Sequence, residues 1–407
     1  MKTPADTAAP RRVLAHMLAL ATAVQIVATT SALSLTALAP AASAGLGLGA
    51  YVIGYQVSAI YAAGMVSSAL AGTLVSRHGP GRIEALALVC FTLGLLGLSS
   101  ANLTLMLVAT LAIGVGYGLN NPAASEMLAP VTPARLRNLV FSLKQSGVPL
   151  GGVVASVALP LVEPVLGWRG ALAVAAAAPF LVLVWLCLGH RPAPRRPEGA
   201  RPGFGRGILD EQSLIWRDAG LRALSLLGLL YSALQLAVSA FTVVTLVHDV
   251  GWSVIAAGSL AAFTQLAGAL GRVGWGVVAD RLGGAFRTMG LIGLISGLAC
   301  LAIPFLADLP LSVQAMLFLT LGATSIGWNG VLLAAIARHA PAGRVAATTG
   351  AVLVYTFIGV IIGPSSFAAL YLLFGDYGSA FAAFSVFGLA GAVLGFRTHS
   401  GGRRRES

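Results

Sequence analysis

The sequence predicts an all-α polytopic membrane protein with twelve transmembrane helices in two pseudo-symmetric six-helix bundles. Three observations predict this class: the composition, the length of the apolar runs, and a repeat at half the chain length. Of 407 residues, 57% are hydrophobic and only 9% are charged, which is far more apolar than a soluble domain. A hydrocarbon core about 30 Å thick needs roughly 20 apolar residues per helical crossing. The period-2 alternation of a membrane β-strand is absent, so helices are expected to cross the bilayer.

Apolar runs of the required length recur along the chain. The first follows a short basic segment and could suggest a cleavable signal peptide. At roughly 26 residues it is too long for the apolar region of a signal, which has about 7 to 15 residues, so we predict a helix instead. The twelve predicted helices cover residues 13–38, 49–75, 84–101, 104–128, 138–162, 168–189, 221–247, 252–279, 288–306, 310–337, 345–373 and 379–397.

One long polar segment separates the first six helices from the last six. It contains four prolines and the arginines at 191, 195, 196, 201, 206 and 217, a composition typical of a linker. The predicted organisation is an N-terminal six-helix bundle at 1–189, a cytoplasmic linker at 190–220, a C-terminal six-helix bundle at 221–397 and a basic cytoplasmic tail at 398–407.

Lysine and arginine concentrate on one side of the predicted topology. Because basic residues are retained on the cytoplasmic side, both termini are predicted to be cytoplasmic, in a multi-pass protein of the cell inner membrane. The basic residues of that side are Lys2, Arg11, Arg12, Arg77, Arg82, Arg135, Arg137, the linker arginines, Arg281, Arg287, Arg338, Arg344 and Arg403 to Arg405, whereas the opposite side has Arg169. This topology explains the net charge of +12, and no nucleic-acid partner is expected.

Residues for covalent or metal chemistry do not stand out in the sequence. Cys90, Cys187 and Cys300 lie inside apolar runs, which argues against a disulfide framework or a C-x-x-C metal pair. There is no G-x-x-x-x-G-K-[ST] loop for direct ATP drive and no nucleophile and base pair. We therefore expect a protein that is not an enzyme and that uses no metal or other cofactor.

An internal repeat relates the two halves. Four short patterns recur at spacings between 204 and 212 residues, each at the equivalent helix of its half. Parallel repeats of six helices are typical of transporters. The pairs are Gly72-x-x-x-Ser76-Arg77-x-Gly79 with Gly276-x-x-x-Asp280-Arg281-x-Gly283, Gly118-Leu119-Asn120 with Gly327-Trp328-Asn329, Gln25 and Thr29 with Gln235 and Ser239, and Gly147-x-x-x-Gly151 with Gly359-x-x-x-Gly363.

On the segments AGTLVSRHGPGR, WGVVADRLGG and KQSGVPLGG, the chain resembles the major facilitator superfamily over essentially its full length. The resemblance implies the major facilitator fold, and a gating role for the loop residues. The sequence departs from the family pattern at Ser76, where an acidic residue is usual, and in the helix at 104–128, which lacks an arginine before its glycines. The predicted gating residues are Gly72, Arg77, Gly79, Arg82, Glu126, Gly276, Asp280, Arg281 and Gly283.

Two positive side chains are predicted deep in the membrane. At 1.5 Å per helical residue, Arg272 lies about 12 Å inside Asp280, and Lys144 lies about 10 Å beyond Arg137. An intramembrane charge costs several kcal/mol unless it is paired or hydrated. No carboxylate is predicted at similar depth, so an anionic substrate is the simplest counter-charge. The alternatives are a structural arginine bonded to backbone carbonyls and a lysine that reaches the cytoplasmic interface.

The segment around Arg272, GRVGWGVVAD, also resembles one helix of the monocarboxylate transporters and the bacterial oxalate carrier. That local resemblance implies a carboxylate clamp, and a guanidinium group suits bidentate carboxylate binding.

Neutral polar residues on four helices predict a polar pathway. The alternative is hydrogen bonding between helices, worth about 0.6 kcal/mol on average in membranes. With the two cations, the predicted substrate-binding residues are Arg272, Lys144, Gln25, Thr29, Tyr117, Asn120, Asn121, Gln235, Ser239, Trp328 and Asn329.

The functional prediction is a secondary or facilitative transporter of a small organic anion, with a carboxylate as the expected class. It would work by alternating access in the inner membrane, as a monomer in the lipid bilayer, with a coupling proton or counter-anion left open. One alternative is an efflux antiporter for hydrophobic or cationic compounds, which should have a deep carboxylate. The other is a non-transporting receptor or scaffold of the same fold.

Overall fold

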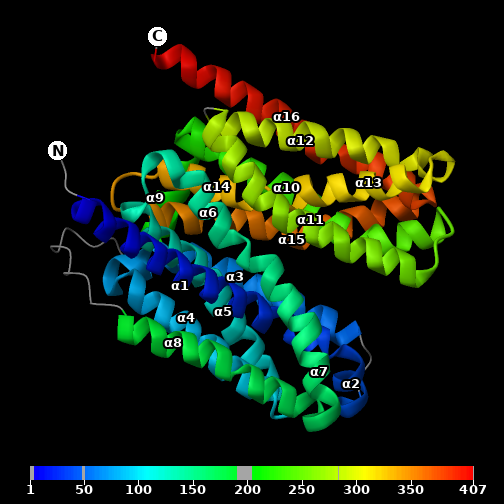
Figure 1. Cartoon of the computed structure of the whole chain (residues 1–407), viewed down its shortest axis with the longest axis horizontal. Helices are drawn as coiled ribbons and strands as arrows, with labels where there is room; N and C mark the ends of the chain where they lie inside the picture. The colour runs from blue at the N-terminus through cyan, green and yellow to red at the C-terminus, as the bar shows by residue number, and fades with distance from the viewer. Residues whose placement is uncertain (1–3, 48–50, 190–203, 283, 407) are drawn as a thin grey trace. The chain divides into compact units, whose positions relative to one another are not determined.

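The computed structural model describes residues 4–47, 51–189, 204–282 and 284–406, and helices make up nearly all of them (Figure 1). The first half contains α1 (Pro4–Ala37), α2 (Ala39–Leu46), α3 (Tyr51–His78), α4 (Pro80–Leu98), α5 (Leu103–Leu128), η1 (Ala129–Val131), η2 (Ala134–Leu136), α6 (Arg137–Gln145), α7 (Gly147–Ala175) and α8 (Ala177–Gly189). The rest contains α9 (Phe204–Arg217), α10 (Ala219–His248), α11 (Val254–Arg281), α12 (Ala285–Ala302), η3 (Ile303–Asp308), α13 (Leu311–Leu321), η4 (Gly322–Ile326), α14 (Asn329–His339), α15 (Val345–Phe374) and α16 (Tyr377–Glu406). The all-α prediction is confirmed.

Ten segments of the described chain are long and apolar enough to cross a membrane. One of them, Ala134–Leu188, has 55 residues, and a Gly167 φ of 68° interrupts its helix, which leaves room for two crossings. α11 is not among the ten, but its 28 residues also suffice for a crossing. With the long segment taken as two crossings and α11 included, the segments correspond to the twelve predicted helices.

Two of the predicted helices are broken in their interior. The helix predicted at 138–162 is divided between α6 and α7 at Ser146. The helix predicted at 310–337 is divided between α13 and α14 by the π-helical turn η4. Each break removes regular i to i−4 hydrogen bonds and frees backbone carbonyls for other partners.

The described chain forms two compact units that exchange short segments of sequence. Unit 1 is 1–133, 147–214 and 340–354, and unit 2 is 134–146, 215–339 and 355–407. α6 therefore belongs to unit 2, where it packs against α11 and α14. The start of α15 belongs to unit 1. The bundles at 1–189 and 221–397 remain a prediction from the sequence repeat.

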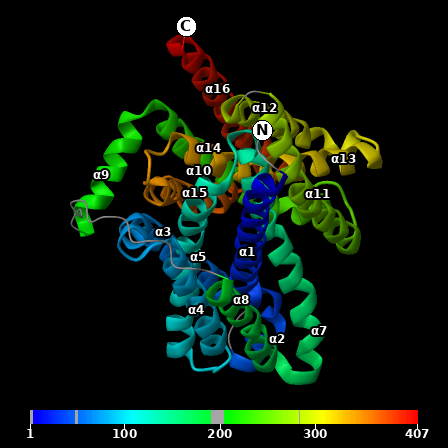
Figure 2. The ribbon, with the colours of Figure 1, turned by 60° about the vertical axis from the view of Figure 1, so that its left-hand side comes forward.

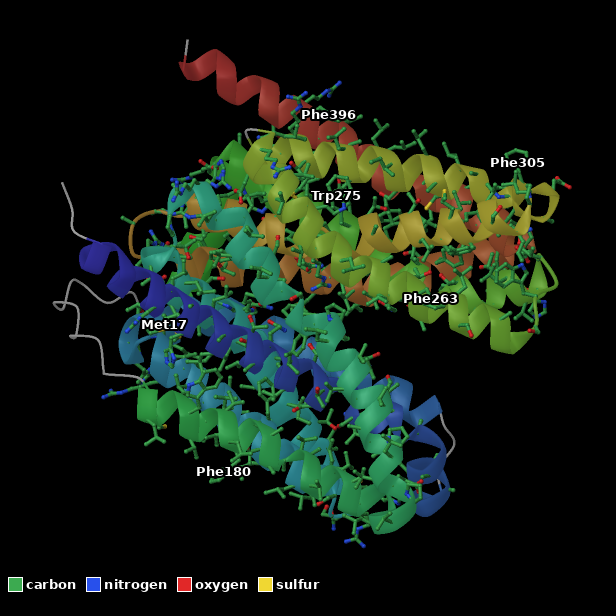
Figure 3. All side chains as sticks on the ribbon, viewed as in Figure 1. Met17, Phe180, Phe263, Trp275, Phe305 and Phe396 are labelled. Atoms are coloured by element: carbon green, nitrogen blue, oxygen red, sulfur yellow. The ribbon has the colours of Figure 1, made fainter. Side chains whose placement is uncertain are left out.

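Unit 1 is built on close contacts between α3, α4 and α5. The backbone of α5 approaches α3 at Gly118, where an added Cβ would lie 2.1 Å from the Gly64 carbonyl oxygen. Small residues that permit such approach are the usual interfaces of membrane helices. Large apolar side chains cover the outside of the unit, and Phe180 on α8, 52% exposed, is an example (Figure 3). A lipid-facing surface of this kind is expected of spanning helices.

Unit 2 has α12 and α16 packed along each other (Figure 2). Gly293 and Gly391 leave space for the Tyr231 ring, whose hydroxyl donates to the Met289 carbonyl oxygen at 2.6 Å. Phe305, 63% exposed, lies on the outer surface of this unit (Figure 3). The unit therefore has a close-packed interior and an apolar exterior, like unit 1.

The sequence did not reveal that the predicted linker contains a helix. α9 occupies Phe204–Arg217 and buries Ile215, while residues 190–203 lie outside the described chain. Apolar residues at 208 and 215, seven apart, are the helical signal that was available. At the other end, α16 continues to Glu406 through most of the predicted tail.

Candidate functional site

The two predicted deep cations meet at Gln145 in unit 2. Arg272 on α11 donates through Nη1 to the Gln145 carbonyl oxygen at 2.6 Å, and Lys144 Nζ donates to the Gln145 side-chain Oε1 at 3.3 Å. Each of the two side chains is only 1% exposed. The structure thus brings two buried positive groups together at one residue.

Broken helices explain how Arg272 is held. Gln145 is the last residue of α6, and Ile326 is the last residue of η4, so neither carbonyl is committed to a regular helical ladder. Arg272 Nη1 donates to the first carbonyl, and Nε donates to the Ile326 oxygen at 3.1 Å. Helix carbonyl ends carry partial negative charge, which favours a cation there.

This geometry bears on the two roles considered for Arg272. The bonds to two carbonyls match a structural arginine. The bond to the same residue that binds Lys144 is compatible with a substrate clamp. Both roles stand, because a clamp must itself be held in place before it can orient a carboxylate.

The neutral polar residues of unit 2 form a small network. Gln235 Oε1 accepts from Trp328 Nε1 and from Asn329 Nδ2, each at 3.1 Å. The Trp328 ring, fully buried, also makes an edge contact with Tyr231. Ser239, one turn after Gln235, is exposed and accepts from Gln265 Nε2 at 3.3 Å. These contacts join α10, α11 and α14. They match the alternative prediction that the neutral polar residues make hydrogen bonds between helices instead of binding substrate.

A simpler polar group occupies the equivalent place in unit 1. Asn120 Nδ2 donates to Gln25 Oε1 at 3.1 Å, which links α5 to α1. Within the described chain, Asn120 Oδ1 and the nearby Thr29 Oγ1 are buried without a hydrogen-bond partner. Asn121 is 8% exposed, and the Tyr117 ring makes an edge contact with Tyr61. Buried acceptors without a donor are costly, and a water or ligand donor would relieve the cost.

The predicted gating residue Asp280 binds the first turn of α6. Its Oδ1 accepts from Asn138 Nδ2 at 2.5 Å, and its Oδ2 accepts from the Leu139 backbone N–H at 3.0 Å. A carboxylate at a helix N-terminus satisfies free N–H groups and complements the helix dipole. Gly276 permits the contact, because an added Cβ would lie 2.6 Å from Ser142 Oγ. Arg281 is exposed, and Gly283 lies outside the described residues.

The predicted gating residue Glu126 binds the first turn of α15 in unit 1. Its Oε2 accepts from the Ala346 backbone N–H at 2.8 Å. Gly72 permits a similarly close approach, because an added Cβ would lie 2.4 Å from the Ala347 Cβ. Of the remaining residues predicted here, Gly79 joins α3 to α4 with a φ of 84°, and Arg77 in the last turn of α3 and Arg82 in the first turn of α4 are exposed.

The structure also shows buried polar residues that sequence reasoning missed. Glu84 on α4 is only 1% exposed, so the structure adds a buried carboxylate to those considered from the sequence. It lies near the start of α4, a helix that packs against α5. Gln145 was also missed, although it directly follows Lys144.

Comparison with known proteins gives a consistent family. A family model described as Major Facilitator Superfamily matches residues 20–364. An uncharacterized MFS-type transporter of Mycobacterium tuberculosis is 30% identical over 56% of this chain, which spans about half the length of that relative. The 4-hydroxybenzoate transporter PcaK of Pseudomonas putida is 26% identical over 82% of this chain and 81% of its own.

Solved structures show the same fold. The Escherichia coli fucose:proton symporter FucP superposes with a TM-score of 0.73 at 17% identity, covering 93% of this chain and 97% of the symporter. The match extends over nearly all of both chains. The predicted helical membrane fold is therefore confirmed.

Proposed function

The chain belongs to the Major Facilitator Superfamily of secondary transporters, and we propose that its cargo is a small organic anion, with a monocarboxylate as the expected class. One observation carries the proposal: two buried cations, Lys144 and Arg272, are hydrogen-bonded to the same residue. Transport would follow alternating access in the inner membrane, with both termini cytoplasmic.

Electrostatics favours an anion at this place. Two positive groups that are buried and bonded to the same residue repel each other more strongly than they would in water, because the local dielectric constant is low. Any group of negative charge that enters reduces this repulsion. A carboxylate also matches the guanidinium fork and an ammonium point charge, so it can contact both.

Relatives support a carboxylate as the first class to test. The Pseudomonas putida relative is named for 4-hydroxybenzoate, an aromatic carboxylate. The local resemblance around Arg272 to monocarboxylate and oxalate carriers points the same way. The polar residues Gln25, Thr29, Asn120 and Asn121 in unit 1 remain predicted contacts for the neutral part of the cargo.

Gating is part of the same proposal. We infer that Asp280 and Glu126 hold the first turns of α6 and α15 in one conformation and release them in the other. Each contact joins a carboxylate to a helix N-terminus, so it can break without leaving a buried charge if water enters.

One observation favours the alternative of an efflux antiporter for hydrophobic or cationic compounds. Such a carrier should contain a buried carboxylate, and Glu84 is one. Glu84 lies on α4, whereas the buried cations lie on α6 and α11. The two candidates therefore rest on different residues and can be separated by mutation.

Uptake into proteoliposomes tests the proposal. The substrates are labelled 4-hydroxybenzoate, benzoate and nicotinate, with uncharged nicotinamide as the neutral match for nicotinate. We expect uptake of at least one acid by the wild type, and a decrease of about 10- to 100-fold in Arg272→Gln and in Lys144→Gln, the effect of losing a charged hydrogen bond.

The exposed Arg12→Gln is the matched control and should transport like the wild type. Uptake that is unchanged in Arg272→Gln would remove the clamp. Uptake of a lipophilic cation that is lost in Glu84→Gln would favour the antiporter instead.

A further inference from the structure

The chain uses arginine in place of lysine almost everywhere. Of its 25 basic Lys and Arg residues, only Lys2 and Lys144 are lysines. Lys144 is thus the one lysine outside the extreme N-terminal segment, and it is also one of the most buried charged residues described. Where only positive charge is needed, this chain uses arginine, so position 144 calls for a property that arginine lacks.

The property that distinguishes the two side chains is proton release. A guanidinium group stays protonated in proteins, whereas a buried amine exchanges its proton readily. A lysine at position 144 can therefore release a proton, whereas Arg272, bonded to the same residue Gln145, stays positive. The shared residue Gln145 offers an oxygen to each of them.

Arg272 is a charged group toward the Lys144 end of α6. The elements packed against α6 are α11, α14 and the short helix η2. Their other titratable or charged residues are Asp280 and Arg281 at the end of α11, Arg338 and His339 at the end of α14, and Arg135 on η2, while α6 itself begins with Arg137. Asp280 contacts Asn138 and Leu139, at the opposite end of α6 from Lys144.

We propose that Lys144 carries the proton that is coupled to anion transport. The proposal rests on the proposed function, because the anion is what drives protonation. An arriving carboxylate favours the ammonium form of an amine that it contacts. Anion and proton therefore bind together, each strengthening the binding of the other.

The proton balance is simple. On the loading side, the Lys144 Nζ lone pair forms an N–H bond with a proton from water as the carboxylate binds. On the release side, the carboxylate leaves, the N–H bond breaks, and the proton returns to water. One negative and one positive charge cross together, so symport of a monoanion is electroneutral and needs no carboxylate side chain as the proton carrier.

Substituting Lys144→Arg separates the charge from the proton. Arginine keeps the positive charge but does not release its proton. In proteoliposomes that enclose a pH-sensitive dye, wild-type uptake of 4-hydroxybenzoate or nicotinate should acidify the lumen, with about one proton per anion. An inward proton gradient of one pH unit should drive accumulation of about tenfold.

Lys144→Arg should still exchange labelled for unlabelled anion, but it should not acidify the lumen, and its accumulation ratio should fall to about 1. The matched control is the same exchange of basic residue type at an exposed position, Arg12→Lys, which should behave like the wild type.

Separate outcomes overturn the two proposals. If the wild type transports none of the acids, the proposed function fails. If the wild type transports an acid without proton movement, or Lys144→Arg remains proton-coupled, only the coupling role of Lys144 fails.

If the Lys144→Arg protein folds poorly, two further measurements test the proposal. Proton uptake on nicotinate binding to the purified wild type is obtained by calorimetry in two buffers of different ionisation enthalpy, and about one proton per anion is expected. Lys144→Gln should bind the anion more weakly and take up no proton, and proton uptake at the wild-type level would contradict the proposal.

Discussion

The first turns of α6 and α15 are held in the same way by carboxylates from different helices. In unit 2, Asp280 on α11 accepts from the Leu139 N–H of α6. In unit 1, the repeat places Ser76 at the position of Asp280, and Glu126 on α5 accepts from the Ala346 N–H of α15. A helix N-terminus needs an acceptor, but several neighbouring helices can supply it. The contact is therefore shared by the two units although the residue position is not.

The same comparison separates the polar centres of the two units. Gln25 with Asn120 and Gln235 with Asn329 make equivalent hydrogen bonds between helices. The charges are not repeated: at the repeat spacing, Arg272 corresponds to Ser68 and Lys144 to Thr356. The repeat thus preserves the neutral hydrogen bonds between helices, while the buried cations Lys144 and Arg272 both lie in unit 2 and have neutral counterparts.

The largest expected effect is at the charged positions. Lys144→Thr gives α6 the residue type that the repeat has at position 356, and anion uptake should fall by about 10- to 100-fold because a charge-assisted contact is lost. Thr356→Ala, at the equivalent neutral position, should change uptake by less than about threefold. Equal losses in both variants, measured as initial uptake rates, would mean that the asymmetry has no functional meaning.

Removing the Asp280 carboxylate should have the next largest effect. In Asp280→Asn, the first turn of α6 loses an anionic acceptor, at a cost of about 1 to 2 kcal/mol. The apparent Tm in detergent should decrease. Cysteines introduced at the start of α6 should also react faster with a water-soluble thiol reagent. A reaction rate that stays at the wild-type value would argue against any holding role.

Glu126→Gln should have a smaller effect, because Asp280 binds both a side chain and the backbone of the first turn of α6, whereas Glu126 binds the backbone N–H of Ala346 on α15. We expect a loss of about 1 kcal/mol in apparent stability. The double variant Glu126→Gln with Ser76→Asp moves the acid to the position used in unit 2 and should recover part of the loss. Failure to recover, with Ser76→Asp alone well folded, would show that α3 cannot reach the first turn of α15.

The smallest expected effect is at α9. Glu211 accepts from Arg344 Nε at 2.9 Å, yet burial raises the pKa of Glu211, and the nearby arginine only partly offsets this. Folding then favours the protonated carboxyl, so stability falls as pH rises through the raised pKa. Glu211→Gln should flatten this pH dependence of the apparent Tm and change uptake little. A steeper dependence in the variant would contradict the sign of the shift.

Hydrophobic length and periodicity were sufficient to predict most helices. The run predicted at 104–128 is α5 at Leu103–Leu128, and the run predicted at 252–279 is α11 at Val254–Arg281. Such limits follow from local composition, because a spanning helix must satisfy its own backbone and face lipid over a set length. Lys144 and Arg272 are buried, and their depth in the membrane stays a prediction from the same arithmetic.

The sequence by itself thus indicated a membrane protein, its helical class, its repeat and the two basic residues that turn out to be buried. Only the tertiary structure decided the partners of those residues. The carbonyl that binds Arg272 exists because α6 ends at Gln145, and Glu126 reaches a helix 220 positions later in the chain. Such contacts depend on where separate helices come to lie, and a local pattern of apolar residues carries no information about that.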